Sequence, residues 1–217
     1  MKQEEVIKSI SYNQEEIIVN IMKLYGIQRI ELDPTYSKGV FYKHIQKPKY
    51  IYDLYPQVPE CKKADCRKLP FGSETLDSIM FDPPFTAGIP NSSKFSEKSN
   101  IIPNRFGSVK SSIAKELWTF YYDSLLEFYR LLRPKGILIF KCQDTVSAGK
   151  QFLSHVQIIN MAYSIGFYPK DLFVLLAKYR VLSSKHKNQQ HSRKYHAYFL
   201  VFIKEQSPVK YGIIKND

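Results

Sequence analysis

The sequence predicts an α/β fold, with a mostly parallel open sheet that ends in an antiparallel hairpin. Strand-like and helical segments alternate along the chain, and four consecutive strand-like segments each end in an aspartate. The last two apolar segments, 173–182 and 195–204, are typical of paired strands joined by a polar connector. With 217 residues and 44% hydrophobic content, the chain is expected to form a single domain over 1–217, with loop insertions near 86–112 and 183–196.

The first helix and the segment after it have clear boundary signals. Asn13 can cap a helix whose apolar residues recur at helical spacing, and Gly26 is a natural stop for it. We expect a short strand over 28–32, ending before Asp33, and a short helix within 35–43.

Three more strand-like segments follow, at 50–53, 61–65 and 79–82, and each also ends in an aspartate. The four residues are Asp33, Asp53, Asp65 and Asp82. Parallel strands bring their carboxyl ends to one edge of a sheet, so we expect the four carboxylates to surround a common crevice. For any one of them alone, a helix N-cap or a turn residue is the simpler interpretation.

The second half of the sequence begins with a long polar segment. Residues 86–112 are rich in Ser, Asn, Pro and Lys and lack periodicity, and structureless loops of this length are typically lids, binding loops or disordered. An amphipathic helix is expected over 113–132, ended by an Arg-Pro-Lys-Gly sequence, with a buried fifth strand over 137–142. A last helix over 151–165, stopped by Gly166, precedes the hairpin.

The chain is strongly basic, which favours a polyanionic partner such as nucleic acid. It has 32 Lys and Arg against 20 Asp and Glu, for a formal net charge of +12. From Lys178 to His196 there are six Lys or Arg residues and no acid, a pattern suited to a phosphate backbone. The expected nucleic-acid contacts in the two insertions are Lys94, Lys98, Arg105, Lys185, Lys187, Arg193 and Lys194.

Cysteine usage, histidine spacing and hydropathy argue against a disulfide-stabilised, metal-binding, secreted or membrane-spanning protein. Three cysteines are too few for a disulfide framework and lack zinc-ligand spacing, which fits a reduced, cytoplasmic compartment. Three histidines recur at a five-residue step from His186 to His196, but no cysteine or carboxylate cluster accompanies them, so no metal site is expected. The N-terminus has no apolar signal core, and no apolar run of about 18 residues occurs, so neither secretion nor membrane spanning is expected.

The sequence Asp82-Pro83-Pro84-Phe85 carries the strongest chemical signal, and we assign these four residues as catalytic. Proline cannot donate to a sheet ladder and restricts the residue before it, so the strand must stop at Asp82 and continue as a rigid turn. An exocyclic amine of a nucleobase is a poor nucleophile because its lone pair is delocalised into the ring. Two hydrogen-bond acceptors, here the Asp82 carboxylate and the Pro83 carbonyl, would let the nitrogen pyramidalise, while Phe85 offers a stacking face for a flipped base.

In these residues the chain resembles the Rossmann-like, class I amino-methyltransferases that use S-adenosylmethionine. Their Asp/Asn-Pro-Pro-aromatic motif ends the fourth strand and contacts the target amine. The resemblance covers about residues 13–142 and part of the C-terminal hairpin, and the approach to the motif, ADCRKLPFGSETLDSIM, is also typical of that family. It implies the Rossmann-like class I methyltransferase fold, S-adenosylmethionine as cofactor and methyl transfer to an amino group.

The resemblance also implies a set of cofactor-binding residues. Asp53 matches the acid that holds the ribose hydroxyls, and Asp65 matches the acceptor of the adenine amine. The remaining positions are Cys66, Leu69 and Phe71 beside the adenine ring, and Asp33, Pro34, Thr35, Ser37 and Gly39 in the first loop. That loop has one glycine where the family usually has two or three. Because Asp53 and Asp65 are both present at sensible spacing, we favour a variant first loop over a degraded site.

Three functions remain open at this level. The leading hypothesis is methyl transfer from S-adenosylmethionine to an exocyclic amine of a nucleobase, with adenine N6 in DNA placed first. The alternatives are an RNA methyltransferase acting on adenine N6 or guanine N2, and a catalytically inactive nucleic-acid-binding module on the same fold. Lys141 and Asp144, at the end of the fifth strand, either face the target nucleotide or form an ordinary salt-bridged loop.

Overall fold

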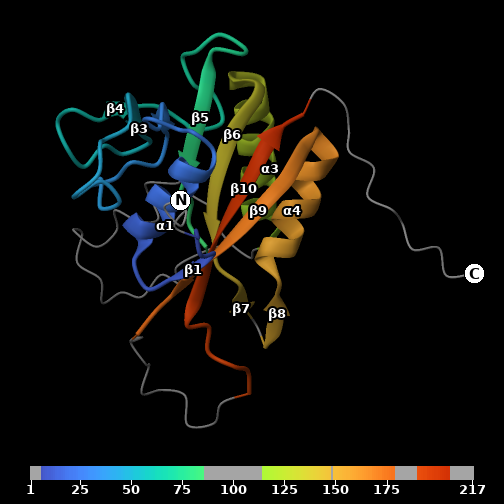
Figure 1. Cartoon of the computed structure of the whole chain (residues 1–217). Helices are drawn as coiled ribbons and strands as arrows, with labels where there is room; N and C mark the ends of the chain where they lie inside the picture. Colours follow the sequence, from blue (N-terminus) through green and yellow to red (C-terminus); the bar gives the residue numbers. More distant parts are fainter. Residues whose placement is uncertain (1–5, 86–113, 148, 179–189, 206–217) are drawn as a thin grey trace, which may run out of the picture.

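The computed structural model describes residues 6–85, 114–147, 149–178 and 190–205 (Figure 1). Its main feature is an eight-stranded sheet with the order β1-β9-β10-β6-β5-β2-β3-β4, and a separate two-stranded sheet pairs β7 with β8. The strands are β1 (Ile10–Ser11), β2 (Leu32–Asp33), β3 (Tyr50–Asp53), β4 (Lys62–Lys63), β5 (Leu76–Phe81), β6 (Leu132–Cys142), β7 (Thr145–Ser147), β8 (Lys150–Phe152), β9 (Phe167–Leu176) and β10 (His196–Lys204). The helices are α1 (Gln14–Leu24), α3 (Ala114–Leu131) and α4 (Ser154–Ile165).

The strand directions confirm the fold class predicted from the sequence. Strands β4, β3, β2, β5 and β6 are parallel neighbours, whereas β10 is antiparallel to both β6 and β9. This is the predicted Rossmann-like arrangement, a mostly parallel sheet with a C-terminal antiparallel hairpin. The carboxyl ends of β2, β3, β4 and β5 therefore lie along one edge, which is where open α/β sheets bind ligands.

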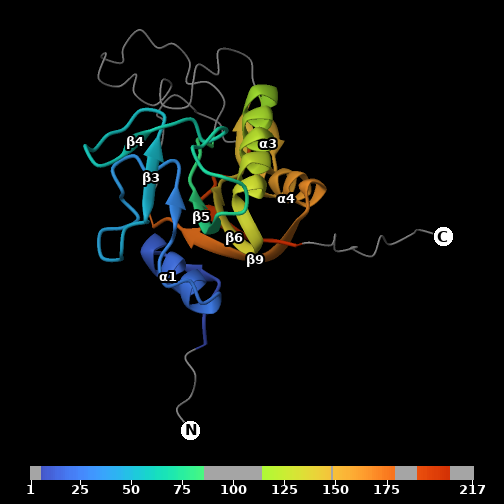
Figure 2. The ribbon, with the colours of Figure 1, turned by 90° about the horizontal axis from the view of Figure 1, so that it is seen from above.

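The two faces of the sheet are covered by different helices. Figure 2 shows α1 on one face and α3 and α4 on the other. Side chains alternate along each strand, so Met80 and Ile139 face α1, whereas Phe81 and Phe140 lie in the core beneath α3. The sheet thus buries one apolar cluster on each side.

Helix α1 has the boundaries that the sequence predicts. The Asn13 side chain accepts a hydrogen bond from the Glu15 N–H at 2.9 Å, and Gly26 follows with a φ of +66°. Strand β3 covers 50–53 as expected, and Gly166 ends α4 in the left-handed conformation.

Strand β2 is shorter than predicted and comes later in the chain. The expected strand over 28–32 is replaced by Leu32–Asp33 alone. Side chains substitute for ladder bonds just before it: the Glu31 N–H donates to Ser78 Oγ, and the Asp77 N–H donates to the Glu31 carboxylate. The third strand is likewise reduced from 61–65 to the two residues of β4.

The short helix expected within 35–43 is wrong, and this segment is a series of turns. The N–H groups of Thr35 and Ser37 donate to the carboxylates of Asp33 and Asp53. A helical backbone would orient these N–H groups differently. Ser37 and Gly39 also have positive φ angles, of 54° and 66°, which a right-handed helix excludes.

Several boundaries in the second half also differ from expectation. Helix α4 begins at Ser154 because 150–152 form β8, which pairs with β7 in an unpredicted hairpin. Strand β6 begins at Leu132 and includes the Arg-Pro-Lys-Gly sequence expected to precede it, while helix α3 matches its prediction to within a residue at each end. The loop predicted at 86–112 and the first half of the 183–196 connector, 183–189, lie outside the described residues.

The two outermost strands of the large sheet, β1 and β4, have only two residues each. Strand β1 pairs with β9 at Val174 and Leu175, and β4 is made of two exposed lysines. The part of β9 that β1 leaves uncovered includes Pro169, which has no N–H, and the exposed Lys170.

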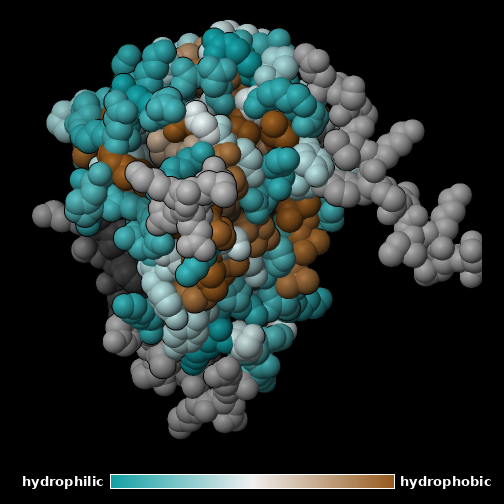
Figure 3. Space-filling model, in the orientation of Figure 1, coloured by the Kyte–Doolittle hydropathy of each residue, from teal (hydrophilic) through white to brown (hydrophobic). Residues whose placement is uncertain are grey.

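On the face shown in Figure 3, apolar residues reach the surface in separate groups among hydrophilic ones. Across the residues that the structure describes, none of the helices combines the length and apolar character that a bilayer crossing requires.

Candidate active site

Three of the four predicted aspartates lie at the carboxyl ends of neighbouring strands, and the fourth lies close by. Asp33 and Asp53 end β2 and β3, and both are only 1% exposed. Asp82 follows β5 directly, and Asp65 comes two residues after β4. Since the strand order is β5-β2-β3-β4, the spatial order of the acids is Asp82, Asp33, Asp53, Asp65. The sequence-based expectation that they share one edge is consistent with this order.

Asp33 is a buried carboxyl that organises the first loop. One of its oxygens accepts from the Thr35 N–H at 2.9 Å, and the other accepts from the Tyr42 hydroxyl at 2.8 Å. Burial raises the pKa of Asp33 to about 7, and the charge of Asp82 acts in the same direction, although the bonds from Thr35 and Tyr42 oppose the rise. The side chain therefore changes its protonation state near neutral pH.

Asp53 ties the first loop to the turn after β3. Its two carboxylate oxygens accept from the Ser37 N–H and the Tyr55 N–H, each at 2.9 Å. A carboxylate oxygen can accept more than one hydrogen bond, and hydroxyl groups are suitable donors to it.

Two of the four acids, Asp53 and Asp65, line a pocket, whereas Asp33 and Asp82 are not part of its lining. The pocket is lined by Pro34, Thr35, Asp53, Leu54, Asp65, Cys66, Arg67 and Phe120. Five of these residues belong to the predicted cofactor set, whereas Leu54, Arg67 and Phe120 were not identified from the sequence. Arg67 could have been found from its place beside Asp65 in one turn, but Phe120 comes from α3 and carries no local signal.

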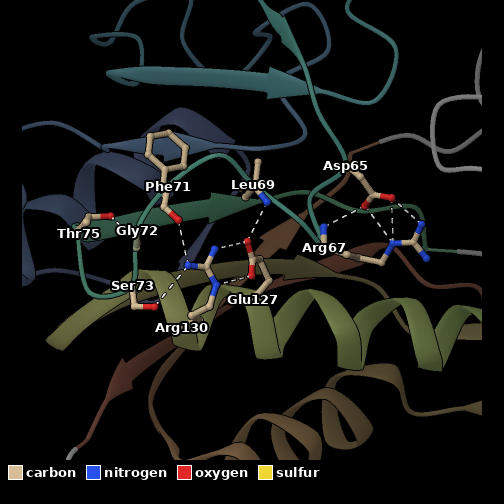
Figure 4. Close-up of polar contacts among 9 residues, drawn as sticks. All are labelled: Asp65, Arg67, Leu69, Phe71, Gly72, Ser73, Thr75, Glu127 and Arg130. Atoms are coloured by element: carbon tan, nitrogen blue, oxygen red, sulfur yellow. Dashed lines mark hydrogen bonds and ion pairs between the residues drawn. The ribbon is translucent and has the colours of Figure 1, made fainter.

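Asp65 and Arg67 form an ion pair at the rim of this pocket (Figure 4). The guanidinium donates to both carboxylate oxygens, with Nη2 2.6 Å from Oδ2 and Nε 3.0 Å from Oδ1. The Arg67 hydrogen bonds hold the pKa of Asp65 below its usual range. The guanidinium carbon also lies 5.7 Å from the centre of the Phe120 ring.

Cys66, next to this pair, contributes as an apolar side chain. Burial raises the pKa of its thiol to about 12, and its sulfur lies 3.5 Å from Ser124 Oγ. It therefore stays protonated at neutral pH.

Two other predicted cofactor residues, Leu69 and Phe71, do not line the pocket. The Leu69 side chain is buried in the core, and its N–H donates to Glu127 at 2.8 Å. Phe71 packs against Tyr50, and its carbonyl accepts from Arg130. Figure 4 shows Glu127 and Arg130, both from α3, holding this segment from below. The predicted role of Leu69 and Phe71 beside the cofactor remains a prediction.

Ser37 and Gly39 also lie outside the pocket lining. Ser37 contributes its backbone N–H to Asp53, as described above. Gly39 has a φ of +66°, and a Cβ placed there would come within 2.3 Å of the Tyr36 hydroxyl. A glycine at this position allows the first loop to fold tightly against Tyr36.

The Asp82-Pro83-Pro84-Phe85 turn is held by hydrogen bonds to the first loop and to α3. The Asp82 N–H donates to the Thr35 hydroxyl at 2.9 Å, and the Tyr121 hydroxyl donates to the Pro84 carbonyl. Thr35 also lines the pocket, so the turn and the pocket share a side chain. Pro83 is buried, whereas Asp82 and Phe85 are half-buried.

Lys141, on β6, faces this turn. Its ammonium lies 3.5 Å from the Asp82 carboxylate and among the rings of Phe41, Phe85 and Phe199. Asp144 is different: it is buried and bonded to His155, whose Nδ1 lies 2.7 Å away at the start of α4. Of the two interpretations open for these residues, Asp144 fits the local ion pair and Lys141 lies at the site.

Most of the predicted nucleic-acid contacts cannot be placed. Lys94, Lys98, Arg105, Lys185 and Lys187 lie outside the described residues. Arg193 is exposed, and Lys194 is half-buried with its ammonium donating to Ser192. Both precede β10, which begins at the carboxyl edge because it runs against β6. Within the described ranges, no group of three or more His, Cys, Asp or Glu side chains is placed to hold a metal ion.

Comparison with known proteins supports the fold at low sequence identity. No protein-family model and no curated protein matches the chain. A candidate hemolysin from Lactococcus lactis matches with a TM-score of 0.51 and 12% identity, over 90% of this chain and 88% of that one. A structure concerned with converting a disulfide bond into a thioacetal group in echinomycin biosynthesis matches with a TM-score of 0.50 and 12% identity, over 85% of this chain and 80% of that one.

A candidate DNA modification methylase from Thermus thermophilus, complexed with S-adenosyl-L-methionine, is more distant in shape. Its TM-score is 0.44 at 15% identity, over 69% of this chain and 54% of that one. The chain thus spans about half the length of the Thermus protein. At such identities the likeness describes the fold, and the activity has to be argued from the residues.

Proposed function

We propose that this chain transfers a methyl group from S-adenosylmethionine to an exocyclic amino group of a nucleobase, with adenine N6 in DNA as the first target to test. The observation that carries the proposal is the position of Asp82. Its carboxylate stands on a proline-fixed turn whose backbone is bonded to Thr35, a residue of the pocket between Asp53 and Asp65. The Thr35 side chain thereby connects the proposed amine acceptor, Asp82, with the candidate cofactor pocket.

The pocket residues fit S-adenosylmethionine by their chemistry. Asp53 is a carboxylate suited to accept from ribose hydroxyls, and Asp65 would accept from an adenine amine in place of part of its bonding to Arg67. Leu54 and Phe120 supply apolar surface for a ring, while Pro34 and Thr35 line the side nearest Asp82. When bound, this cofactor supplies a methyl group made electrophilic by its sulfonium.

The protein's part in the reaction is to orient the target amine. A carboxylate oxygen of Asp82 and the Pro83 carbonyl would accept the two N–H groups, which directs the nitrogen lone pair outward. Tyr121 and Thr35 hold the turn, so these acceptors are preorganised before the substrate arrives. Phe85 would stack on the base, and extrusion of a base from a duplex costs a few kcal/mol.

A nucleic-acid substrate is supported by charge. The net charge of +12 favours a phosphate backbone, and Arg193 is exposed just before the start of β10 at the same edge as Asp82. The acceptors described here would serve adenine or guanine in either polymer, so DNA and RNA must be compared directly.

The test is transfer of a labelled methyl group to duplex DNA, single-stranded DNA and structured RNA, with nucleoside mass spectrometry to identify the base. We expect Asp82→Ala to lower the transfer rate by at least about 10²–10³-fold, because the amine loses its main acceptor. Cofactor affinity, measured by calorimetry, should stay within about twofold because Asp82 is not part of the pocket lining. The matched control is Asp77→Ala, which changes an aspartate at the other end of β5 whose side chain is 67% exposed.

Three outcomes would contradict the proposal. A normal rate for Asp82→Ala would remove Asp82 from the reaction. Loss of cofactor binding in the same variant would show that the two roles are wrongly assigned. If the unaltered protein fails to bind S-adenosylmethionine at millimolar concentration, a nucleic-acid-binding module without catalysis becomes the better description.

A further inference from the structure

We infer that Lys141 is a positioning residue of this site, which keeps the Asp82 side chain as a fixed, charged acceptor in front of the target amine. The inference rests on the proposed function for its purpose, but the contacts that support it belong to the free protein. They also allow it to be tested without any methyl transfer.

The register of the sheet brings the two side chains together. Strands β5 and β6 are parallel neighbours, with Phe81 paired to Phe140, so the next residues, Asp82 and Lys141, are side by side. Both face the α1 side of the sheet, as do Met80 and Ile139 two residues earlier. The Lys141 ammonium lies 3.5 Å from Asp82 Oδ1, and its side chain is 12% exposed against 27% for Asp82.

Three aromatic rings hold the ammonium in this place. Its nitrogen lies 4.7 Å from the centre of the Phe41 ring and 5.7 Å from those of Phe85 and Phe199. Cation–π contacts of this kind are attractive, and they gain strength when the site is shielded from water. The rings come from three different parts of the chain, so the lysine is restrained from several directions.

Phe85 gives this arrangement a link to the substrate. The same ring that we propose as the stacking face for the base also contacts the Lys141 ammonium. The lysine therefore touches the two groups, Asp82 and Phe85, that would receive the target nucleotide.

Asp82 shares this edge of the sheet with another acid, so a nearby cation favours its ionised form. The titratable groups that act on it are Asp33 on β2, Tyr42 in the first loop, Tyr121 on α3 and Lys141 on β6. Two carboxylates in one site disfavour each other's ionisation, whereas an ammonium favours it. An ionised Asp82 can accept the amine N–H with either oxygen and accepts more strongly, whereas a protonated carboxyl turns one oxygen into a donor.

The primary test is a ¹³C NMR titration of the Asp82 carboxyl in the free protein, assigned by its absence in Asp82→Asn. We expect Lys141→Met, which keeps the side-chain length and removes the charge, to raise the pKa of Asp82 by about 1–3 pH units. Lys141→Arg keeps the charge and should raise it by less than about half a unit. The matched control is Lys49→Met, because Lys49 also lies 3.5 Å from a carboxylate, but its partner is Glu31 and its own side chain is 51% exposed.

The titration tests the charge contact between Lys141 and Asp82 independently of any activity. A shift in Lys141→Met but not in Lys49→Met supports it, and an unchanged Asp82 titration in a folded Lys141→Met protein overturns it. If Lys141 served only to pack the aromatic rings, its replacement would lower the melting temperature without moving the Asp82 titration. Should Lys141→Met fail to fold, Lys141→Gln is titrated with the same expectation.

A second measurement connects the result to the reaction. In the variant, the acid limb of the pH profile of kcat/KM for methyl transfer should move upward by the same amount as the Asp82 titration. If the unaltered protein transfers no methyl group, that result counts against the proposed function alone. The titration of Asp82 in the free protein still tests its contact with Lys141. A shifted titration with an unshifted activity profile would show that Asp82 is not the acceptor and would overturn the positioning role.

Discussion

The two halves of the sheet are built in different ways. Strands β2, β3 and β4 have two, four and two residues, whereas β5, β6, β9 and β10 have six, eleven, ten and nine. In the short-strand half, buried carboxylates of Asp33 and Asp53 hold the loops through backbone N–H groups. In the long-strand half, aromatic side chains such as Phe81 and Phe140 fill the core.

This difference explains how the site is divided. The pocket belongs to the half whose loops depend on charge and hydrogen bonds, and Asp82 directly follows the first strand of the half that depends on packing. Apolar packing is insensitive to pH, whereas buried carboxylates are not. We therefore expect the two halves to respond differently to substitution and to acidity.

The largest effect is expected from the packed half. Phe140→Ala removes a ring that is fully buried, 5.0 Å from the Phe81 ring centre and 5.3 Å from that of Tyr121. Truncation of a buried phenylalanine costs about 3–5 kcal/mol, through lost burial and the cavity left behind. Urea denaturation should show this loss equally at pH 5 and pH 8. A loss that varied strongly with pH would contradict the contrast between the halves.

The second effect is a pH dependence that comes from Asp33. Its pKa is raised from 3.8 to about 7, so between these values the folded state binds more protons than the unfolded state, and stability falls as the pH rises. At roughly 1.4 kcal/mol per pH unit, the fall is at most about 4 kcal/mol. Asp33→Asn mimics the neutral acid and should lack it.

The measurement is the free energy of unfolding of both proteins from pH 4 to pH 8. The unaltered protein should lose stability relative to Asp33→Asn over this range and level off above pH 7. Parallel curves for the two proteins would show that Asp33 is not the source.

The smallest effect is expected at Asp53. Asp53→Asn replaces one of two acceptors by an amide N–H₂, so either the Ser37 or the Tyr55 N–H loses its partner. An unsatisfied buried donor costs about 1–3 kcal/mol, and because both of these bonds are part-buried we expect a loss at the lower end of that range. Asp77→Asn is the control, since its exposed ion pair with Arg133 contributes about 0–1 kcal/mol. Equal effects in the two variants, measured by urea denaturation, would contradict the structural role of Asp53.

The sequence predicted the elements whose signals are local. The Asn13 cap, the Gly166 stop and the strand at 50–53 depend on neighbouring residues alone, and all three are found. The prediction of a helix within 35–43 was wrong because N–H groups of this segment donate to the side chains of Asp33 and Asp53. The Asp53 carboxylate accepts from Ser37, which is sixteen residues away in the sequence. Contacts at that separation leave no trace in local periodicity.

The site was predictable to a similar extent. Acids at the ends of parallel strands can be located from strand order, which is why Asp33, Asp53 and Asp82 were expected together. The contact of Lys141 with Asp82 requires the register between β5 and β6, and that of Phe120 with the pocket requires the packing of α3. No short stretch of the sequence indicates either contact.

The two-residue outer strands have a consequence for self-association. An open sheet can be lengthened by another chain that adds a strand to its margin. Among the described residues, that margin offers a pair of lysines on one side and, on the other, a two-residue strand beside a stretch of β9 containing a proline. The exposed lysines of β4 and the stretch of β9 with Pro169 and Lys170 disfavour the addition of a strand at these two places.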